Sequence, residues 1–554
     1  MIGNINQSNE AFLMDTLGKH TLQGAEFNSS ERYPPPTCHP GTRVDLSDRI
    51  WRWVNNTTRE KRILWLHGPA GVGKSATMQT VAEEDSDSQS PVLGATLFFS
   101  RPSKRDDPQR VFVTIAYQLA VKYPEYRQHV LGMLTVDPKL PTKSMKEQFK
   151  RLIAQPFGHM ELLKSHYDTV VIVIDGLDEC KGEQAQRDLM LLIAKFNLDF
   201  PSSPLIWIIA SRPESHLQVL FSSEPLQSTH LDVDIPIDSD EACRDVELFL
   251  RDRFTEIRQK FPSSFLLTQE WPRESQFTKL SMSSSGLFVF ASTAIRFIED
   301  EGYNNPVMQL EKVLAVIDST TPVELSVHPL ASLDGLYASI LSAIPADVYE
   351  STNEILLQFV GESGILKGWD FSEACNFLGF SQPRIFSSIS KLHSVLKVPR
   401  PDNALLRELM VYHASFTDYL NSPRSGSFFL DPSQIRLHAL SLSVRVMREA
   451  HCEAESNVRA SRILISWPSR GQDPQDLQRR MAAEAIQLFN NLYEAHGYEG
   501  SPVDLKLISA FFRDLEFPTA FLETCGRSFY VLILNSFLKT VRSSPLRGIV
   551  LVTY

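Results

Sequence analysis

One loop, GPAGVGKS at residues 68–75, constrains the fold of this 554-residue chain more than any other stretch. Gly68, Gly73, Lys74 and Ser75 match the pattern G-x-x-x-x-G-K-[ST], between an apolar run (RILWLH, 62–67) and the start of an amphipathic helix. In such a loop backbone N–H groups turn toward phosphate oxygens, the helix dipole favours the anion, and lysine reaches the β and γ phosphates. The alternative is a glycine-rich turn that binds nothing, and the strand-loop-helix context favours nucleotide binding over it.

We therefore expect a nucleotide to lie against the whole loop: Gly68, Pro69, Ala70, Gly71, Val72, Gly73, Lys74, Ser75 and Ala76. The Ser75 hydroxyl is also a candidate ligand for Mg²⁺. The N-K-x-D tetrapeptide associated with guanine recognition is absent, which favours adenine, so the expected cofactors are ATP or ADP with Mg²⁺.

A second motif, VVIVIDGLDE at residues 170–179, supplies carboxylates. Asp175 ends an apolar strand, and open α/β sheets bind ligands at the carboxyl ends of their strands, so we expect it to hold Mg²⁺ together with Ser75. Glu179, or in second place Asp178, is a candidate for polarising the water that attacks the γ-phosphate. The alternative is an acidic turn after a buried strand.

A third motif, IIASRP at residues 208–213, ends the next apolar strand with Arg212. A guanidinium there can reach the γ-phosphate and distinguish ATP from ADP. The alternative is an arginine in a turn that the following proline stops.

The order of the apolar runs predicts an α/β fold. Between residues 61 and 235, short runs rich in β-branched and aromatic residues alternate with longer amphipathic stretches, which is typical of a parallel sheet covered on both faces. Beyond residue 238 the pattern becomes helical. Residues 1–44 are polar and end in a proline-rich linker, RYPPPTCHPGTR at 32–43.

Composition excludes several classes of protein. A net charge of -11 argues against nucleic acid as the main partner, because phosphate neutralisation needs a concentrated basic face. The six cysteines contain no C-x-x-C pair, which favours reduced thiols inside the cell over a disulfide frame. No secretory signal and no apolar run long enough to span a bilayer are found, so we expect a cytoplasmic protein.

The three motifs in this order and spacing (GPAGVGKSA, VIDGLDEC, IIASRPE) resemble the NACHT domains of STAND-class signalling ATPases, especially those of mushroom-forming fungi. The resemblance extends from CHPGTR (38–43) through TLFFSR (96–101), VTIAYQLA (113–120) and GLFVFASTAIRFI (286–298) to HASFTDYL (413–420). It covers roughly residues 20–430 and implies five regions: an N-terminal polar segment and linker (1–44), a NACHT P-loop NTPase core (45–237), a helical subdomain (238–325), a winged-helix-like subdomain (326–430) and a helical C-terminal region (431–554).

The resemblance implies a molecular switch, with signalling in innate immunity or programmed cell death as the family's setting. Members hold ADP in a closed monomer, exchange it for ATP, form homo-oligomers and reset by slow hydrolysis. His413 looks like the winged-helix histidine that touches the β-phosphate of ADP, or it is a packing histidine. Arg43 is similarly placed to approach the adenine or ribose, or it is a surface arginine after a turn.

The sequence departs from the family at both ends. No effector domain precedes the linker, and the last 125 or so residues lack the repeats of a sensor domain, so protein partners supplying those functions are expected. A truncated or decoy switch fits this pattern. Two further alternatives remain: a housekeeping P-loop ATPase that works as a motor, and a catalytically inactive nucleotide-binding scaffold.

Overall fold

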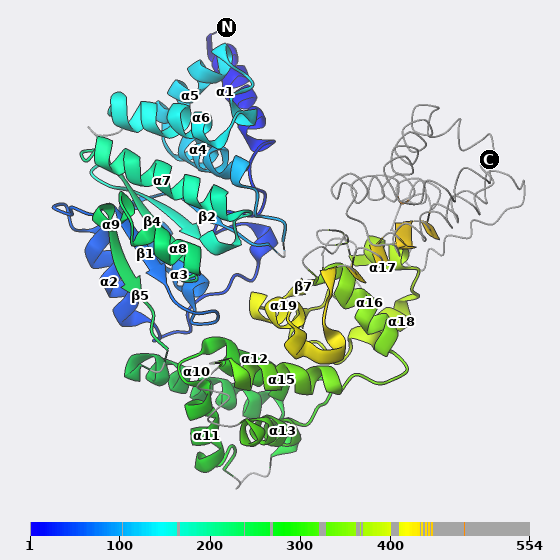
Figure 1. The fold of residues 1–554 in the computed structure, drawn as a ribbon. Helices are drawn as coiled ribbons and strands as arrows, with labels where there is room; N and C mark the ends of the chain where they lie inside the picture. The colour runs from blue at the N-terminus through cyan, green and yellow to red at the C-terminus, as the bar shows by residue number, and fades with distance from the viewer. Residues whose placement is uncertain are drawn as a thin grey trace, which may run out of the picture. The chain divides into compact units, whose positions relative to one another are not determined.

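The computed structural model describes residues 2–101, 103–162, 167–237, 239–265, 270–320, 328, 330–361, 366, 369, 371–399, 409–432, 434–435, 438–439, 441–443, 445–446 and 481. The chain divides into two units (Figure 1). Unit 1 comprises residues 1–339 with 412–416, and unit 2 comprises residues 340–411 with 417–554. Most of the helices predicted for residues 431–554 lie outside the described residues.

A parallel five-stranded sheet forms the centre of unit 1. Its strands are β1 (Ile63–His67), β2 (Leu93–Phe98), β3 (Val170–Asp175), β4 (Leu205–Ser211) and β5 (His230–Asp234). Their order is β2-β3-β4-β1-β5, so β4 lies between the strand that enters the GPAGVGKS loop and the strand that ends in Asp175. Ile63 of β1 pairs with Trp207 of β4 on one side and with His230 of β5 on the other.

Helices cover both faces of this sheet, which is why β2, β3 and β4 are buried along their whole length. Helix α3 packs against β2, β3 and β4, and α4 packs against β2. The helices of this part are α2 (Val44–Val54), α3 (Lys74–Ser86), α4 (Val111–Lys122), α5 (Pro124–Val136), α6 (Met145–Phe149) with its π-helical continuation Lys150–His159, α7 (Glu183–Asp199), α8 (Ser215–Phe221) and α9 (Leu226–Thr229). The predicted α/β class is confirmed.

The N-terminal segment differs from the expected polar segment and linker. Helix α1 (Ile2–Gly18) packs against α4 and α5, and Leu13 and Leu17 are fully buried in the core. The following residues cover the edge strand β2, where Phe98 N donates to the carbonyl of Ala25 over 2.9 Å. Because an uncovered edge strand exposes unpaired N–H and C=O groups, this segment completes the sheet domain and does not merely precede it.

A helical region continues unit 1 after β5. It comprises α10 (Asp240–Lys260), α11 (Glu274–Ser284), α12 (Phe288–Ile298) and α13 (Pro306–Ser319), and α15 (Ala331–Ser342) follows. Ser239 caps α10, its hydroxyl accepting from Ala242 N over 3.1 Å. The short segment 412–416 belongs to this unit through Ser415, whose hydroxyl lies 2.9 Å from the buried Tyr337 hydroxyl.

The described part of unit 2 contains several helices and a small ribbon of two strands. These are α16 (Tyr349–Phe359), α17 (Phe371–Leu378), α18 (Gln382–Ile389), the antiparallel pair β6 (Leu396–Lys397) and β7 (Met410–Val411), most of α19 (Ala414–Leu420) and a 3-10 helix at Pro423–Phe428. Three helices followed by a two-stranded ribbon are compatible with the winged-helix-like subdomain expected for residues 326–430, and that assignment stays a prediction.

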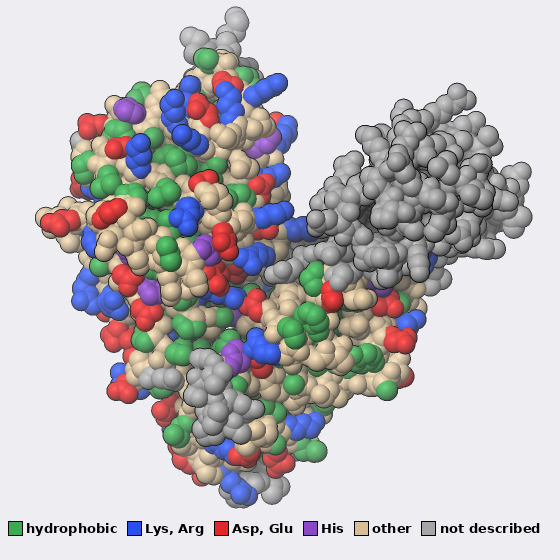
Figure 2. All heavy atoms as spheres, in the orientation of Figure 1, with side chains coloured by type: hydrophobic (Ala, Val, Ile, Leu, Met, Phe, Trp, Pro, Cys, Tyr) green, Lys and Arg blue, Asp and Glu red, His purple; other side chains and the backbone are tan. Residues whose placement is uncertain are grey.

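The surface carries both signs of charge. Acidic and basic side chains are interspersed over the face that Figure 2 shows. Among the residues described, no helix combines the length and the apolar character that a membrane span requires.

Candidate nucleotide-binding site

The loop between β1 and α3, which we call the P-loop (residues 68–75), presents donors and few acceptors. Gly71 and Gly73 adopt φ angles of 82° and 93°, in the left-handed region that favours glycine. Lys74 Nζ donates to the carbonyls of Gly68 and Pro69 over 2.7 and 2.8 Å. Within the described part of the chain, the amides of residues 71–76 have no hydrogen-bond acceptor. Six free N–H groups around a lysine fit the oxygens of a phosphate chain.

Lys74 lies in a buried position among other charges. Burial is the main cause that lowers the pKa of its ammonium to about 8, and the nearby Arg212 guanidinium acts in the same direction. The carboxylates of the DGLDE motif act in the opposite direction. An added polyanion would therefore stabilise the charged lysine, because it supplies negative charge to a desolvated cation.

Ser75 and Asp175 come together, as the proposed metal site requires. The Ser75 hydroxyl donates a hydrogen bond to the Asp175 carboxylate, which is 4% exposed. Burial raises the pKa of Asp175 to about 6, against the hydrogen bond from Ser75 and the charges of Arg32 and Lys74. A hydroxyl and a carboxylate are the oxygen ligands that Mg²⁺ prefers, so this pair fits the ion that the sequence implies.

Glu179 is the last residue of the DGLDE motif that begins with Asp175. It ends a 3-10 turn after β3 (Leu177–Glu179), and its Oε2 accepts from the backbone N of Arg101 over 3.1 Å. Burial raises the pKa of Glu179 to about 7, and the neighbouring Asp178 contributes in the same direction. A carboxyl with a pKa near the working pH is suited to act as a general base.

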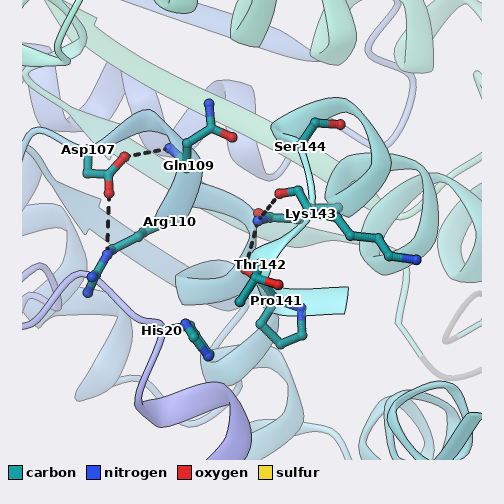
Figure 3. A pocket seen from close by; sticks show the side chains of 9 residues that line it. His20, Asp107, Gln109, Arg110, Pro141, Thr142, Lys143 and Ser144 are labelled. Atoms are coloured by element: carbon teal, nitrogen blue, oxygen red, sulfur yellow. Dashed lines mark hydrogen bonds and ion pairs between the residues drawn. The ribbon is translucent and has the colours of Figure 1, made fainter. Parts of the chain in front are cut away.

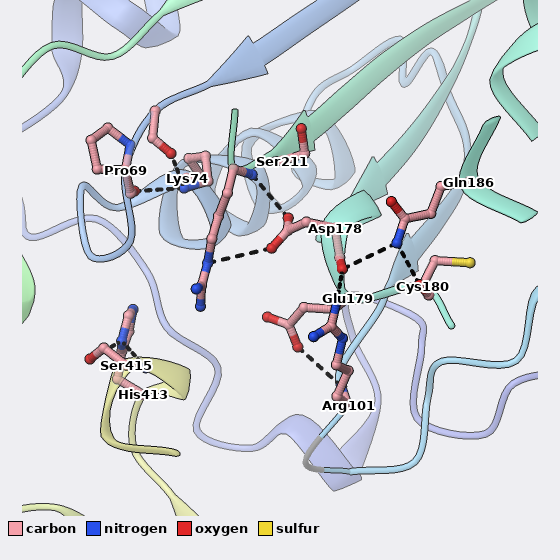
Figure 4. A network of polar contacts seen from close by, with 12 residues as sticks. Pro69, Lys74, Arg101, Asp178, Glu179, Cys180, Gln186, Ser211, His413 and Ser415 are labelled. Carbon is pink, nitrogen blue, oxygen red and sulfur yellow. Dashed lines mark hydrogen bonds and ion pairs between the residues drawn. The ribbon is translucent and has the colours of Figure 1, made fainter. Parts of the chain in front are cut away.

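Asp178 is instead bound to Arg212. Figure 4 shows Asp178 next to Glu179, with a dashed line from Asp178 to Gln186. Asp178 Oδ1 accepts from Arg212 N over 2.9 Å, and its Oδ2 lies 3.4 Å from Arg212 Nε. Since β4 lies next to β3, the strand order alone brings these residues together. Asp178 is thus placed to orient Arg212. The assignment of Glu179 as the general base stays a prediction. The Asp178 carbonyl also accepts from Gln186 Nε2 over 3.3 Å, and sequence reasoning missed Gln186 and Arg101.

His413 belongs to the same unit as the P-loop, and its tautomer follows from its contacts. Nδ1 accepts from the backbone N of Ser415 over 3.1 Å, so the ring hydrogen lies on Nε2. Burial lowers the pKa of His413 to about 3, and the cations Arg212 and Lys74 add to this effect. His413 is therefore a neutral imidazole with one N–H donor, in the electrostatic field of the residues expected to hold phosphate.

Arg43 is buried, being 5% exposed, so the alternative of a surface arginine is wrong. Its Nη2 donates to the carbonyl of Val72 over 2.8 Å, and its backbone N donates to Asp245 Oδ2 over 3.0 Å. The structure gives Arg43 a place against the P-loop main chain. Asp245 carried no motif and was not found from the sequence.

A separate hollow lies elsewhere on unit 1 (Figure 3). It has a volume of about 220 Å³, and its lining includes His20, Arg110 and Lys143. None of its lining residues belongs to the P-loop or to the motifs that end β3 and β4. Lys143 and Arg110 are already paired with the carboxylates of Asp137 and Asp107. The hollow is thus distinct from the candidate nucleotide site.

Comparisons with known proteins give a family match over part of the chain. Residues 43–212, which include the P-loop, Asp175 and Arg212, match the model of a family described as nephrocystin 3, N-terminal. No curated protein matches the sequence. Of the solved structures, a Walker-type ATPase of Pyrococcus abyssi is 13% identical, with a TM-score of 0.34 over 70% of this chain and 98% of that one. The ORC2 protein of Aeropyrum pernix, solved as ADPNP-ADP complexes, is 11% identical, with a TM-score of 0.32 over 73% of this chain and 98% of that one.

The class follows from the sheet and the loop together. Unit 1 has the α/β fold of a P-loop NTPase: a parallel sheet whose first strand runs through the GPAGVGKS loop into α3, with acidic residues at the end of β3.

Proposed function

We propose that this protein binds ATP and ADP with Mg²⁺ and works as a nucleotide-dependent signalling switch of the NACHT type, in which slow hydrolysis resets the active state. The observation that carries the proposal is the P-loop itself. Six amides without acceptors surround Lys74, and the Ser75–Asp175 pair lies next to them. This arrangement suits the tail of a nucleotide and its metal better than any other ligand.

Different residues of the site would bind the phosphates, hold the metal and activate the water. The amides of residues 71–76 and Lys74 bind the phosphates, and Ser75 and Asp175 would hold Mg²⁺. When bound, the ion neutralises charge on the phosphate oxygens. Glu179 accepts the proton of the attacking water through the carboxylate oxygen that is not fixed by the Arg101 amide.

Two residues can make the switch sensitive to the γ-phosphate. Arg212 carries a positive charge at the end of β4, where Asp178 orients it. His413 offers a neutral N–H on a segment that follows β7. A ligand shifts a conformational equilibrium only if it binds the two conformations with different affinities. A switch between ADP and ATP therefore needs at least one contact that favours ATP in one conformation and another that favours ADP in the other. Arg212 and His413 are our candidates for these two contacts.

The test combines two measurements on the purified chain. Acid extraction identifies the nucleotide that copurifies, and native mass determination before and after exchange of ADP for ATP reports the oligomeric state. A switch is expected to release ADP and to gain mass with ATP. Purification without any nucleotide, together with no measurable ADP binding, would contradict the proposal.

Turnover separates the switch from the two alternatives. A motor hydrolyses ATP steadily, near the median of about 10 per second for enzymes, whereas a switch is expected to be far slower. An inactive scaffold binds nucleotide and releases no phosphate. The paired and oriented carboxylates of the DGLDE motif favour the switch over the scaffold, and effector or sensor functions would come from protein partners.

A further inference from the structure

We propose that Asp245, on helix α10, is a positioning residue for the P-loop: it holds Arg43, and Arg43 orients the peptide group that follows Val72. This inference rests on the proposed function, because it concerns how the same loop binds phosphate. It links the nucleotide affinity of the sheet domain to α10, a helix of the following helical region.

Three contacts form the link. The Asp245 carboxylate accepts from the backbone N of Arg43 over 3.0 Å and lies 3.9 Å from its Nη1. The other end of the guanidinium, Nη2, donates to the carbonyl of Val72 over 2.8 Å. Arg43 and Asp245 are 5% and 8% exposed. Since a buried charge without a partner is costly, removal of Asp245 leaves Arg43 without the group that keeps it in place.

The carbonyl of Val72 matters because of peptide geometry. In a trans peptide the C=O of one residue and the N–H of the next point in opposite directions. Arg43 fixes the Val72 carbonyl, so the N–H of Gly73 turns to the opposite side, among the amides that have no acceptor. The orientation of the Gly73 N–H therefore depends on that of the Val72 carbonyl, which Arg43 fixes.

Helix α12 fixes the preceding peptide in the same way. Val289 N donates to the carbonyl of Gly71 over 3.2 Å, which turns the N–H of Val72 away from α12. The approach is close: a Cβ on Gly71 would lie 2.0 Å from Cγ1 of Val289. Two consecutive carbonyls of the P-loop are therefore held from outside the loop, one by α12 and one by Arg43.

The backbone at Arg43 supports the link. Its φ is 58°, a left-handed conformation that few non-glycine residues adopt and that the surrounding structure must hold. The hydrogen bond from its N–H to Asp245 is one such restraint. Nearby, His39 makes a second contact with the same helix, its Nε2 lying 2.8 Å from Asp252 Oδ2. The Asp252 side chain is 52% exposed, and no contact joins it to the P-loop within the described residues, so it offers a matched control.

The experiment compares Asp245→Ala, Asp245→Asn and the control Asp252→Asn in the full chain. A fluorescent ADP analogue measures nucleotide affinity. The melting temperature of the nucleotide-free protein is the second readout. Asp245→Ala is expected to bind ADP about tenfold more weakly, since it removes the carboxylate that accepts from the Arg43 N–H and lies beside the Arg43 guanidinium. Asp245→Asn keeps an acceptor for the Arg43 N–H and loses the charge, so an intermediate loss is expected. Asp252→Asn should bind as the unchanged protein does.

A double-mutant cycle tests the route through Arg43. If Asp245 acts on the loop only through Arg43, the loss of ADP affinity in Arg43→Ala is not increased by adding Asp245→Ala. Additive losses would overturn the proposed route. A lower melting temperature with ADP affinity within twofold of the unchanged protein would show a merely structural role and also overturn it.

The remaining outcomes are separable. If Asp245→Ala does not fold, the comparison of Asp245→Asn with Asp252→Asn decides, and equal ADP affinity of these two variants would overturn the inference. If the unchanged protein binds no ADP, the proposed function itself fails. Tight binding by the unchanged protein and by both Asp245 variants removes the positioning role while leaving the nucleotide site in place.

Discussion

The Ser75 hydroxyl donates a hydrogen bond to the Asp175 carboxylate, joining the first turn of α3 to the end of β3. The contact crosses β4, the strand between β1 and β3, because α3 packs against all three strands β2, β3 and β4. The two motifs therefore form one site without any bound ligand to draw them together.

Lys74→Ala is expected to abolish binding of ATP and ADP, because it removes a buried cation that the P-loop carbonyls of Gly68 and Pro69 hold in place. Isothermal titration calorimetry measures the loss, which we expect to exceed a hundredfold, or about 3 kcal/mol. The matched control is Lys146→Ala, at an exposed position on α6. Tight ATP binding by folded Lys74→Ala would argue against the site.

Glu179→Gln should retain nucleotide affinity and lose hydrolysis, since glutamine cannot accept the proton of water. The pH profile gives a second measurement. Glu179 has a pKa of about 7 and acts as a base only when ionised, so turnover of the unchanged protein should rise about tenfold between pH 6 and pH 8. Phosphate release under single-turnover conditions measures both effects. An unchanged rate of phosphate release in Glu179→Gln would show that Glu179 is not the general base.

Asp175→Asn is expected to stabilise the metal-free protein at neutral pH while abolishing the Mg²⁺ dependence of nucleotide binding. Burial raises the pKa of Asp175 from 3.8 to about 6, so the protonated form favours the folded state and this contribution is lost as the pH rises through 6. The ionised carboxylate then costs about 3 kcal/mol at pH 7. Chemical denaturation should show the gain at pH 7.5 and little gain at pH 4. Equal stability of the two proteins at pH 7.5 would refute the assignment.

Gly71→Ala should lower both stability and ADP affinity, because its φ is 82° and the added Cβ would lie 2.0 Å from Val289. Overpacking of this kind costs about 1–3 kcal/mol. Thermal denaturation measures the first effect and ADP titration the second. Adding Val289→Ala removes Cγ1 and leaves the Val289 Cβ, which would lie 2.6 Å from the new methyl group, so only part of the loss should be recovered. No recovery would show that the contact with Cγ1 is not the cause of the loss.

His413→Ala is expected to weaken ADP binding about five- to tenfold, the value of one hydrogen bond to a charged group. Since the pKa of His413 is about 3, the imidazole stays neutral from pH 5 to pH 8. ADP affinity of the unchanged protein should therefore show no histidine titration near pH 6.5. His393→Ala, at an exposed position of unit 2, is the control. A step near pH 6.5 that disappears in His413→Ala would mean that the phosphate contact uses the imidazolium.

Local sequence patterns predicted the parts of the fold that depend on neighbouring residues. The apolar runs ending in His67, Asp175 and Ser211 are strands, and the α/β class is confirmed. The roles of Lys74, Ser75, Asp175 and Glu179 stay predictions, although the structure brings these side chains to one edge of the sheet. The residues of a short motif lie close together in the sequence, which is why they can be found without a structure.

Contacts between distant segments were beyond sequence reasoning. Asp245 lies on an ordinary charged face of α10, and only the fold brings it to Arg43. The strand order, with β4 between β1 and β3, was likewise not predicted. The N-terminal helix had a signal that we did not use: Leu13 and Leu17, four residues apart, are at helical spacing and are buried.

The place of α1 has a practical consequence for anyone who produces part of this protein. The family match begins at residue 43, which invites a recombinant fragment starting there. Such a fragment would expose the apolar surfaces of α4 and α5 that α1 covers and would uncover the edge of β2. We expect it to aggregate during purification, and inclusion of the first 42 residues to be the condition for obtaining a well-behaved sheet domain.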